Sequence, residues 1–287
     1  MWIVFNPTAG AARRRRLERA AALLPSARIV ETGAPGDATR LAAGAAAEGA
    51  RVVVAAGGDG TIAEVAAGLA GSGAALGILP FGTANVLARE LGLPLDAEGA
   101  ARVIATGRRG MLRPGLARDA AGNARLFVQM LGVGLDAAVV HALPPGLKRR
   151  LGALAYVVQT LRLLPRHPFA PLRLRADGGP WEECVALLAM KGRLYAGPFV
   201  VAPEARAGME GFILVLQRRG GAGAALLAGA ALPLGLLPRL PFIERRACRA
   251  LEVEGAGLLA QADGDAAPAP PLRLSDAPAP LPVLLPR

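Results

Sequence analysis

In the first part of the chain, short continuous runs of apolar residues alternate with segments whose apolar residues have a helical spacing. The runs at 2–5, 52–56 and 76–79 are short and apolar, which is typical of buried strands. The first run precedes an arginine-rich helix predicted at about 13–24, and the other two precede apolar residues spaced as on one helix face. This alternation of strands and helices predicts a layered α/β domain.

From about residue 124 the pattern changes to apolar strands separated by glycine, proline and arginine turns. We predict strands at 126–131, 172–176, 184–190, 199–202, 212–217 and 250–253, and one helix near 153–164. This pattern is typical of an antiparallel, β-rich fold of the β-sandwich kind. Because 287 residues suffice for two cores, we predict an α/β domain over 1–115 and a β-rich domain over 116–287.

One uncharged stretch, 220–238, is rich in alanine and leucine and lies between Arg219 and Arg239. As a continuous helix it would reach roughly 28 Å, close to the thickness of a bilayer core. Its glycines and Pro233 weaken a spanning helix. We therefore predict a helix packed on the second domain or a flap that contacts lipid, with a transmembrane span as the alternative.

Two glycine-containing turns carry the candidate chemistry. Gly57-Gly58-Asp59-Gly60-Thr61 follows the strand at 52–56, and Pro80-Phe81-Gly82-Thr83-Ala84-Asn85 follows the strand at 76–79. In an open α/β sheet such turns lie at the carboxyl ends of the strands, where ligands bind. Glycine lets bare N–H groups approach an anion, and the following helix adds the positive end of its dipole. The sequence therefore predicts a phosphate cradle.

Asp59 stands where phosphate is expected, and the two anions repel each other unless a divalent cation or a ribose hydroxyl lies beside them. Thr61 and Thr83 offer hydroxyls, and we expect Glu64, in the next helical turn after Asp59, on the same side as that aspartate. The set is typical of a nucleotide triphosphate site, although no Gly-Lys-Ser/Thr follows as in a Walker A loop. The alternative is a tight structural turn, which the presence of a second Gly-Thr turn disfavours.

Taken in order, the motifs resemble a known kinase family. Asn6-Pro7-Thr8-Ala9-Gly10, the Gly57 turn with its Glu64-Val65, and the 80–85 turn resemble the diacylglycerol kinase catalytic-domain family, which includes bacterial lipid kinases and sphingosine kinases. Segments 127–136, 148–156 and 195–205 are similar to later parts of that family, and 261–265 stands where it carries Asp-Gly-Glu. The resemblance covers nearly the whole chain. It implies a two-domain fold shared with NAD kinases, whose C-terminal tail can return to the first domain.

The resemblance implies ATP-dependent phosphoryl transfer to a lipid hydroxyl, with ATP and Mg²⁺ as cofactors. By matching positions, the residues implied to hold ATP are Asn6, Thr32, Gly57, Gly58, Asp59, Gly60, Thr61, Glu64, Gly82, Thr83 and Asn85. Asp59 is implied to organise Mg²⁺ through water. Asp263 and Asp265 are the catalytic candidates at the acceptor, where a carboxylate within hydrogen-bond reach takes the hydroxyl proton. Asp265 is one methylene shorter than the family's Glu.

Two positions depart from the family pattern. Val86 replaces an aspartate of the metal network, and the Asp-Asp-Gly loop that holds a structural Mg²⁺ becomes Met209-Glu210-Gly211, which leaves Glu210 as its candidate metal ligand. A membrane-associated, nucleotide-binding pseudokinase is therefore one alternative to a lipid kinase. An NAD kinase, which shares Gly-Gly-Asp-Gly-Thr, is the other. The acceptor class, diacylglycerol-like or sphingoid, stays open.

The net charge of +11 is carried almost entirely by arginine, in clusters at 13–16, 108–109, 148–150 and 245–246. Such clusters favour peripheral contact with an anionic membrane surface, although arginine on solvated faces gives the same composition. No aromatic residues interleave with them as stacking platforms, so nucleic acid is not an expected partner.

Cys184 and Cys248 have no spacing suited to zinc or to a redox pair, and we predict buried thiols in a reducing compartment. The first residues are too short an apolar run for a signal-peptide core. We expect a cytoplasmic protein that is peripheral at the inner membrane face. The resembled family includes dimers, so a homodimer is compatible with the sequence.

Overall fold

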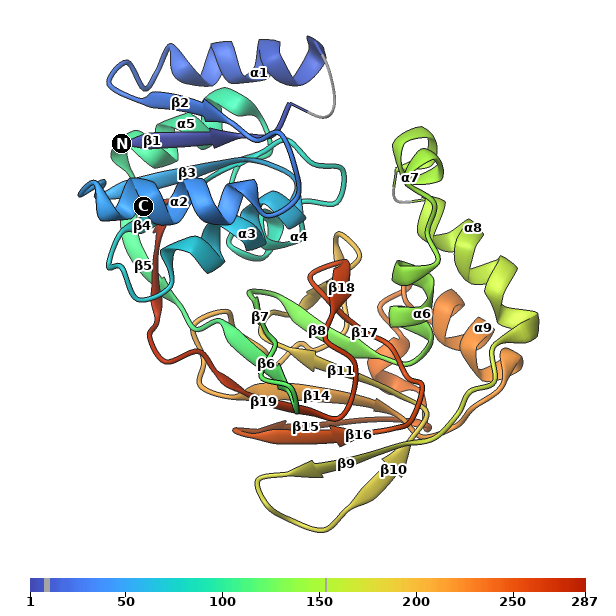
Figure 1. The fold of residues 1–287 in the computed structure, drawn as a ribbon. Helices are drawn as coiled ribbons and strands as arrows, with labels where there is room; N and C mark the ends of the chain where they lie inside the picture. The colour runs from blue at the N-terminus through green and yellow to red at the C-terminus, as the bar shows by residue number, and fades with distance from the viewer. Residues whose placement is uncertain (8–10, 153) are drawn as a thin grey trace. The chain divides into compact units, whose positions relative to one another are not determined.

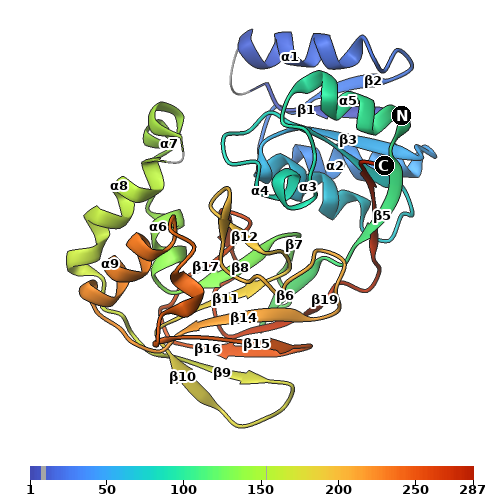
Figure 2. The same ribbon diagram turned by 180° about the vertical axis from the view of Figure 1, so that it is seen from behind.

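The computed structural model describes residues 1–7, 11–152 and 154–287. Within these residues the chain forms two compact units, the first built from 1–114 and 277–287 and the second from 115–276. Figures 1 and 2 show the two units from opposite sides. The C-terminal residues thus belong to the same unit as the N-terminal ones.

The first unit is an α/β layer structure around a mostly parallel sheet. Its strands lie in the order β2-β1-β3-β4-β20-β5. Their bounds are β1 Trp2–Phe5, β2 Arg28–Glu31, β3 Val52–Gly57, β4 Ala75–Pro80, β5 Arg108–Leu112 and β20 Leu281–Leu285. Strand β20 runs parallel to β4 and antiparallel to β5. The proline-rich tail therefore completes this sheet.

Helices cover both faces of this sheet (Figures 1 and 2). Their bounds are α1 Ala11–Ala21, α2 Asp37–Ala47, α3 Asp59–Leu69, α4 Val86–Glu90 and α5 Ala97–Thr106. Helices α1 and α5 share a buried cluster with alternate residues of the strands, such as Ile3, Phe5 and Val54. Strand neighbours Val4, Val53 and Ala55, which point the other way, are also fully buried. Burial on both faces explains why these strands are continuous apolar runs.

The second unit contains two six-stranded antiparallel sheets and one two-stranded sheet among its described residues. One six-stranded sheet has the order β10-β9-β16-β19-β6-β7 and the other β15-β14-β11-β8-β17-β18. The bounds are β6 Gly115–Asp119, β7 Ala124–Phe127, β8 Met130–Val133, β9 Leu172–Ala176, β10 Glu182–Cys184, β11 Ala186–Met190, β12 Leu194–Tyr195, β13 Phe199–Val200, β14 Phe212–Gln217, β15 Ile243–Cys248, β16 Leu251–Glu254, β17 Ala260–Ala262, β18 Asp265–Ala267 and β19 Leu272–Asp276. Strands β12 and β13 pair only with each other.

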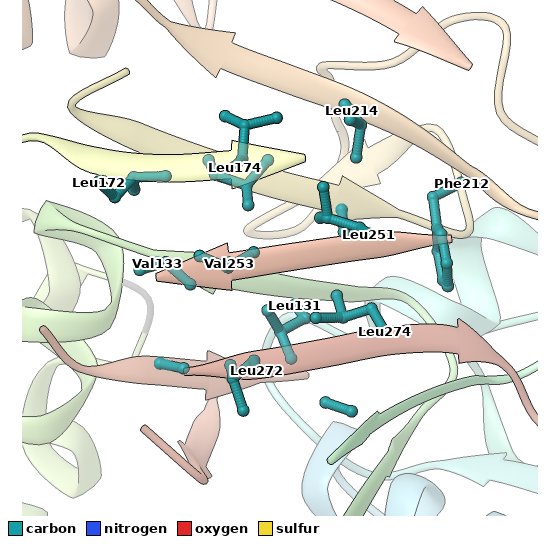
Figure 3. Packing of buried hydrophobic residues seen from close by; sticks show 14 of the residues in the cluster. Leu131, Val133, Leu172, Leu174, Phe212, Leu214, Leu251, Val253, Leu272 and Leu274 are labelled. Carbon is teal, nitrogen blue, oxygen red and sulfur yellow. The ribbon is translucent and has the colours of Figure 1, made fainter. Parts of the chain in front are cut away.

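The core of the second unit lies between its two six-stranded sheets. Leucines of β9, β16 and β19 from one sheet meet Leu131, Phe212 and Leu214 from the other (Figure 3). The rings of Phe127 and Phe212 stack with their centroids 5.8 Å apart. Cys184 and Cys248 are buried free thiols, and burial raises the pKa of each to about 12. The predicted fold class, an α/β domain followed by an antiparallel β-sandwich, is confirmed.

Two of the predicted strands are each divided in the structure. The run 184–190 is divided between β10, which ends at Cys184, and β11, which begins at Ala186 in the other sheet. The apolar run 126–131 predicts a single strand, but β7 ends at Phe127 and β8 begins at Met130. The backbone N–H groups of Val128, Gln129 and Met130 turn away from the sheet ladder and donate to the carboxylate of Asp263. A contact between residues more than 130 positions apart in the sequence therefore interrupts the run.

The second unit also carries a group of helices beside its sandwich (Figure 1). They are α6 Leu135–His141, α7 Pro145–Leu151, α8 Leu154–Leu163, α9 Ala222–Ala231 and the 3₁₀ turns η1 Leu164–Arg166 and η2 Leu237–Arg239. The stretch 220–238 forms α9, a turn and the start of η2, and Ala228 and Ala231 pack on the core of this unit. Within the described part of the chain, we find no helix whose length and apolarity would let it cross a membrane.

Candidate functional site

The two glycine turns of the first unit are joined through Asp59. Its Oδ1 accepts hydrogen bonds from the backbone N–H of Val86 at 2.6 Å and of Leu87 at 3.4 Å. The carboxylate that opens α3 therefore also caps the N-terminus of α4, where negative charge is favoured. Burial raises the pKa of Asp59 above its usual value, and the backbone N–H groups oppose that shift. Parallel strands β3 and β4 thus place both turns at one sheet edge.

Close backbone approach explains the glycines in these turns. A Cβ at Gly82 would lie 2.7 Å from the Cα of Gly58, and one at Gly57 would lie 2.5 Å from Oγ1 of Thr61. No side chain fits in either space. Glycine at Gly57 and Gly82 therefore lets the two turns touch and leaves the backbone N–H groups at the start of α3 without side chains over them.

Asn85 shapes the second turn with its own amide group. Its Oδ1 accepts from the N–H of Gly82 at 2.9 Å, and its Nδ2 donates to the carbonyl of Gly82 at 2.9 Å. The residue is buried and has a φ of 47°, a left-handed conformation that asparagine tolerates better than most side chains. Thr83, within the loop that Asn85 closes, is exposed.

Asn6 and Thr61 are in contact. The Nδ2 of Asn6 donates to Oγ1 of Thr61 at 3.1 Å, which joins the end of β1 to the first turn of α3. Thr32 directly follows β2 and donates its backbone N–H to the carbonyl of Phe5, so it ends beside β1. The last three residues of the Asn-Pro-Thr-Ala-Gly motif, Thr8 to Gly10, lie outside the described residues.

Glu64 has a different partner from the one expected. Its Oε2 accepts from the N–H of Ala38 at 3.2 Å, and its carbonyl accepts from the hydroxyl of Thr39. Both contacts are in the first turn of α2, so the carboxylate serves the N-terminus of that helix. The structure brings together Asn6, Asp59, Thr61, Gly82 and Asn85, and it directs Glu64 toward α2.

Asp263, in the second unit, lies in the tight turn between β17 and β18 with a φ of 52°. Its carboxylate accepts three backbone N–H groups, from Val128 at 2.7 Å, Gln129 at 2.9 Å and Met130 at 3.0 Å. Burial raises the pKa of Asp263 to about 6, and the three N–H donors oppose the shift. This carboxylate therefore holds the β7–β8 connection.

Asp265 differs from Asp263 in its surroundings. Its side chain is 41 % exposed, and its Oδ2 lies 3.4 Å from a guanidinium nitrogen of Arg125. It stands at the start of β18, two residues after Asp263. Of the two aspartates, Asp265 is the one whose side chain is partly open to solvent.

We expect alanine at these two positions to have different effects. Asp263→Ala leaves three N–H groups without their acceptor and should lower the free energy of unfolding by about 3 kcal/mol. Asp265→Ala breaks only a half-exposed ion pair and should change that free energy by less than about 1 kcal/mol. Urea denaturation of both purified variants measures the difference. Equal loss of stability in the two would contradict the assigned roles.

A buried polar cluster next to this turn was not predicted from the sequence. Asp136, in the first turn of α6, accepts from the hydroxyl of Tyr195 and from Nε2 of Gln261, the latter at 2.6 Å. Oε1 of Gln261 in turn accepts from the N–H of Gly264 at 2.8 Å. Burial raises the pKa of both Asp136 and Tyr195. The cluster fixes the turn that carries Asp263, so these residues position it.

A second missed feature is the buried ammonium of Lys191, beside the loop 209–211. Its Nζ donates to the carbonyl of Met209 at 2.9 Å, to that of Gly211 at 2.7 Å and to Oδ1 of Asp276 at 2.7 Å. Carbonyl and carboxylate oxygens are ligands that hard metal cations also use. Here a lysine supplies the positive charge, and the lysine side chain is 0 % exposed.

This arrangement bears on the metal ligands expected from the sequence. Glu210, the candidate ligand of the loop, is exposed. Among the described residues, no group of three or more histidine, cysteine or acidic side chains is arranged to hold a metal ion. Because the Lys191 ammonium already binds the carbonyls of Met209 and Gly211, we do not propose a metal at Glu210. Asp59 stays a prediction as a partner of Mg²⁺.

The sequence of this chain is similar to known proteins of one family. The family model of the diacylglycerol kinase catalytic domain matches residues 1–115. A Pseudomonas aeruginosa protein named "Probable lipid kinase YegS-like" is 34 % identical over 221 residues, which cover 74 % of this chain and 68 % of that protein. A diacylglycerol kinase from Mycobacterium tuberculosis is 31 % identical over 218 residues, covering 74 % and 69 %.

The fold agrees with these sequence relatives. A diacylglycerol kinase from Bacillus anthracis superposes with a TM-score of 0.74 at 20 % identity, covering 99 % of this chain and 96 % of that one. At that identity the match concerns the fold alone, whereas the sequence relatives carry the family assignment. The resemblance found in the motifs is therefore confirmed, and the chain belongs to the diacylglycerol kinase catalytic-domain family of lipid kinases.

Proposed function

We propose that this protein transfers the γ-phosphoryl group of ATP to a hydroxyl of a diacylglycerol-like or sphingoid lipid. The observation that carries the proposal is the junction of the two glycine turns through Asp59 at the carboxyl edge of the first sheet. That junction presents bare N–H groups and a helix N-terminus in a chain that belongs to a lipid kinase family.

ATP binding is assigned to the first unit. The N–H groups from Gly58 to Thr61 and the dipole of α3 suit the phosphates. Thr83 is exposed in the second turn, so we assign its hydroxyl to the same phosphates, and we assign Asn85 to the shape of that turn. Asn6 holds Thr61 at the start of α3, and Thr32 ends at the neighbouring strand.

Mg²⁺ fits this site as a companion of ATP. In nucleotide enzymes Mg²⁺ is usually bound by one or two carboxylates together with the substrate phosphates and water. Asp59 supplies a carboxylate in the glycine turns, which suits that mode of binding. When bound, the ion neutralises phosphate charge during transfer. The contribution of the chain is to hold Asp59 in place through the N–H groups of Val86 and Leu87.

The acceptor hydroxyl is assigned to Asp265. An alcohol is a poor nucleophile at neutral pH, and a carboxylate in hydrogen-bond reach takes its proton as the new bond forms. Asp265 is partly exposed, which suits contact with a substrate. Asp263 is committed to three backbone N–H groups, so we assign it to positioning. Because the acceptor is a membrane lipid, we also propose a peripheral enzyme at the inner, cytoplasmic membrane face.

The proposal is tested by incubating the purified protein with radiolabelled ATP, Mg²⁺ and a mixed lipid extract, followed by separation of labelled lipids. We expect one labelled lipid class, and a signal reduced about a hundredfold or more in Asp265→Ala. NAD is offered in a parallel reaction. Labelled NADP would identify an NAD kinase instead. ATP binding with no labelled product from any acceptor would identify a pseudokinase.

A further inference from the structure

Helix α8 exposes large apolar side chains, whereas a helix that packs only on its own unit usually buries them. Leu154, Val157 and Leu161 are 64 %, 54 % and 54 % exposed. They follow the i, i+3, i+7 spacing of a single helix face. The buried residues of the same helix are Ala155 and Gln159. Leucine and valine thus face outward while alanine and glutamine face inward.

Helix α9 repeats the inversion. Its buried residues are Ala224 and Ala231, whereas Leu226 and Leu227 are 50 % and 51 % exposed. Leu234, in the turn after this helix, is 70 % exposed. The two helices are neighbours, because α9 packs against η1, which directly continues α8 (Figures 1 and 2).

We refer to Leu154, Val157, Leu161, Leu226, Leu227 and Leu234 as the α8–α9 apolar surface. Monomeric proteins rarely leave several large apolar side chains exposed on neighbouring elements unless they contact an apolar partner.

The two chain segments that carry this surface have charges of one sign. No aspartate or glutamate occurs in the segment that contains α8, 137–176, or in the segment that contains α9, 211–243. Arg150, Arg162, Arg166 and Arg239 are exposed in these segments.

Arginines that the sequence also marked as a basic cluster are used elsewhere. Arg245 pairs with Glu204, and Arg246 pairs with Glu182 and Glu244. These two arginines are therefore less available to a partner than the exposed arginines of α8 and η2.

We propose that the α8–α9 apolar surface docks onto an anionic phospholipid bilayer. Leucine and valine side chains enter the acyl boundary, while the arginines meet lipid phosphates. A second copy of this chain suits the surface less well, because its arginines would face those of the first. The choice of lipid as the partner rests in part on the proposed function, whereas the exposure and the charges do not.

The test is co-sedimentation with vesicles, without ATP. Wild-type protein should bind vesicles of phosphatidylcholine and phosphatidylglycerol more tightly than vesicles of phosphatidylcholine alone. The triple variant Leu154→Gln, Val157→Gln, Leu161→Gln should bind both about tenfold or more weakly. The double variant Arg162→Gln, Arg166→Gln should lose only the preference for anionic vesicles, which added salt should also remove.

The matched control is Leu23→Gln, Ile29→Gln, Met111→Gln, which removes three apolar side chains of the first unit that are 39 %, 41 % and 49 % exposed. It should bind vesicles like the wild type. Wild-type protein that fails to bind either vesicle, or a triple variant of α8 that binds as well as the control, overturns the proposal. So does a wild-type dimer that the α8 variant converts to a monomer with vesicle binding unchanged.

The vesicle assay separates this proposal from the proposed activity. Vesicle binding without any labelled lipid in the kinase assay would reject the kinase and retain the docking surface. A labelled lipid in detergent without vesicle binding would do the reverse. Thermal melting of each variant checks its fold, and because the changed side chains are exposed we expect shifts of less than a few degrees.

Discussion

Replacing Asp59 with alanine is expected to slow lipid phosphorylation by about a thousandfold. The change removes the carboxylate from the phosphate-binding turn and also the cap of α4 at Val86 and Leu87. Loss of the cap alone should cost about 1 kcal/mol of stability. Initial rates with radiolabelled ATP and a lipid identified in the mixed extract measure the effect on activity, and thermal melting measures the effect on the fold.

Asp59→Asn separates the two roles of this side chain. Asparagine keeps an oxygen that can accept from the N–H of Val86 but has no charge, so we expect a melting temperature near that of the wild type together with a large loss of activity. Asp37→Ala is the control, because Asp37 also binds backbone N–H groups at a helix start, those of Gly33 and Ala34. Full activity in Asp59→Asn would mean that Asp59 only shapes the turns.

The site in the first unit was largely predictable because it depends on strand order. Parallel strands place their carboxyl ends at one edge, so two turns after two such strands meet whatever their side chains are. The pattern of apolar residues and turns does not predict the hydrogen bond between the Asp59 carboxylate and the backbone N–H of Val86. That hydrogen bond joins the Asp59 carboxylate to a backbone N–H group 27 residues away. It does not involve the side chain of Val86, which is the part of this residue that departs from the family pattern.

The second unit was less predictable because its polar contacts interrupt apolar patterns. Strands β9 and β14 have the predicted bounds, since their apolar residues face the sandwich core. The run 126–131 fails because Asp263 takes the N–H groups of its middle residues. The helix predicted near 153–164 corresponds to α8. The helical spacing of its apolar residues, taken alone, predicts that its leucines face the core. The structure turns them outward, and only the packing of Ala155 and Gln159 reveals it.

Lys191→Met is expected to lower the free energy of unfolding by about 3–5 kcal/mol, the usual cost of breaking a buried ion pair. The change leaves Asp276 without its cation and leaves the carbonyls of Met209 and Gly211 without their donor. It also removes a cation placed 5.0 Å from the centre of the Phe212 ring in the sandwich core. Urea denaturation followed by circular dichroism measures the loss.

Lysine directly after an apolar strand is typical of a solvated strand end, which is why this residue was missed from sequence. The double variant Lys191→Met, Asp276→Asn should be more stable than Lys191→Met alone, because it no longer leaves an unpaired carboxylate. If instead a divalent cation stabilised the loop 209–211, a chelator would lower the melting temperature of the wild-type protein. We expect no such change, because the Lys191 ammonium already binds both carbonyls and the Asp276 carboxylate that a metal ion there would need.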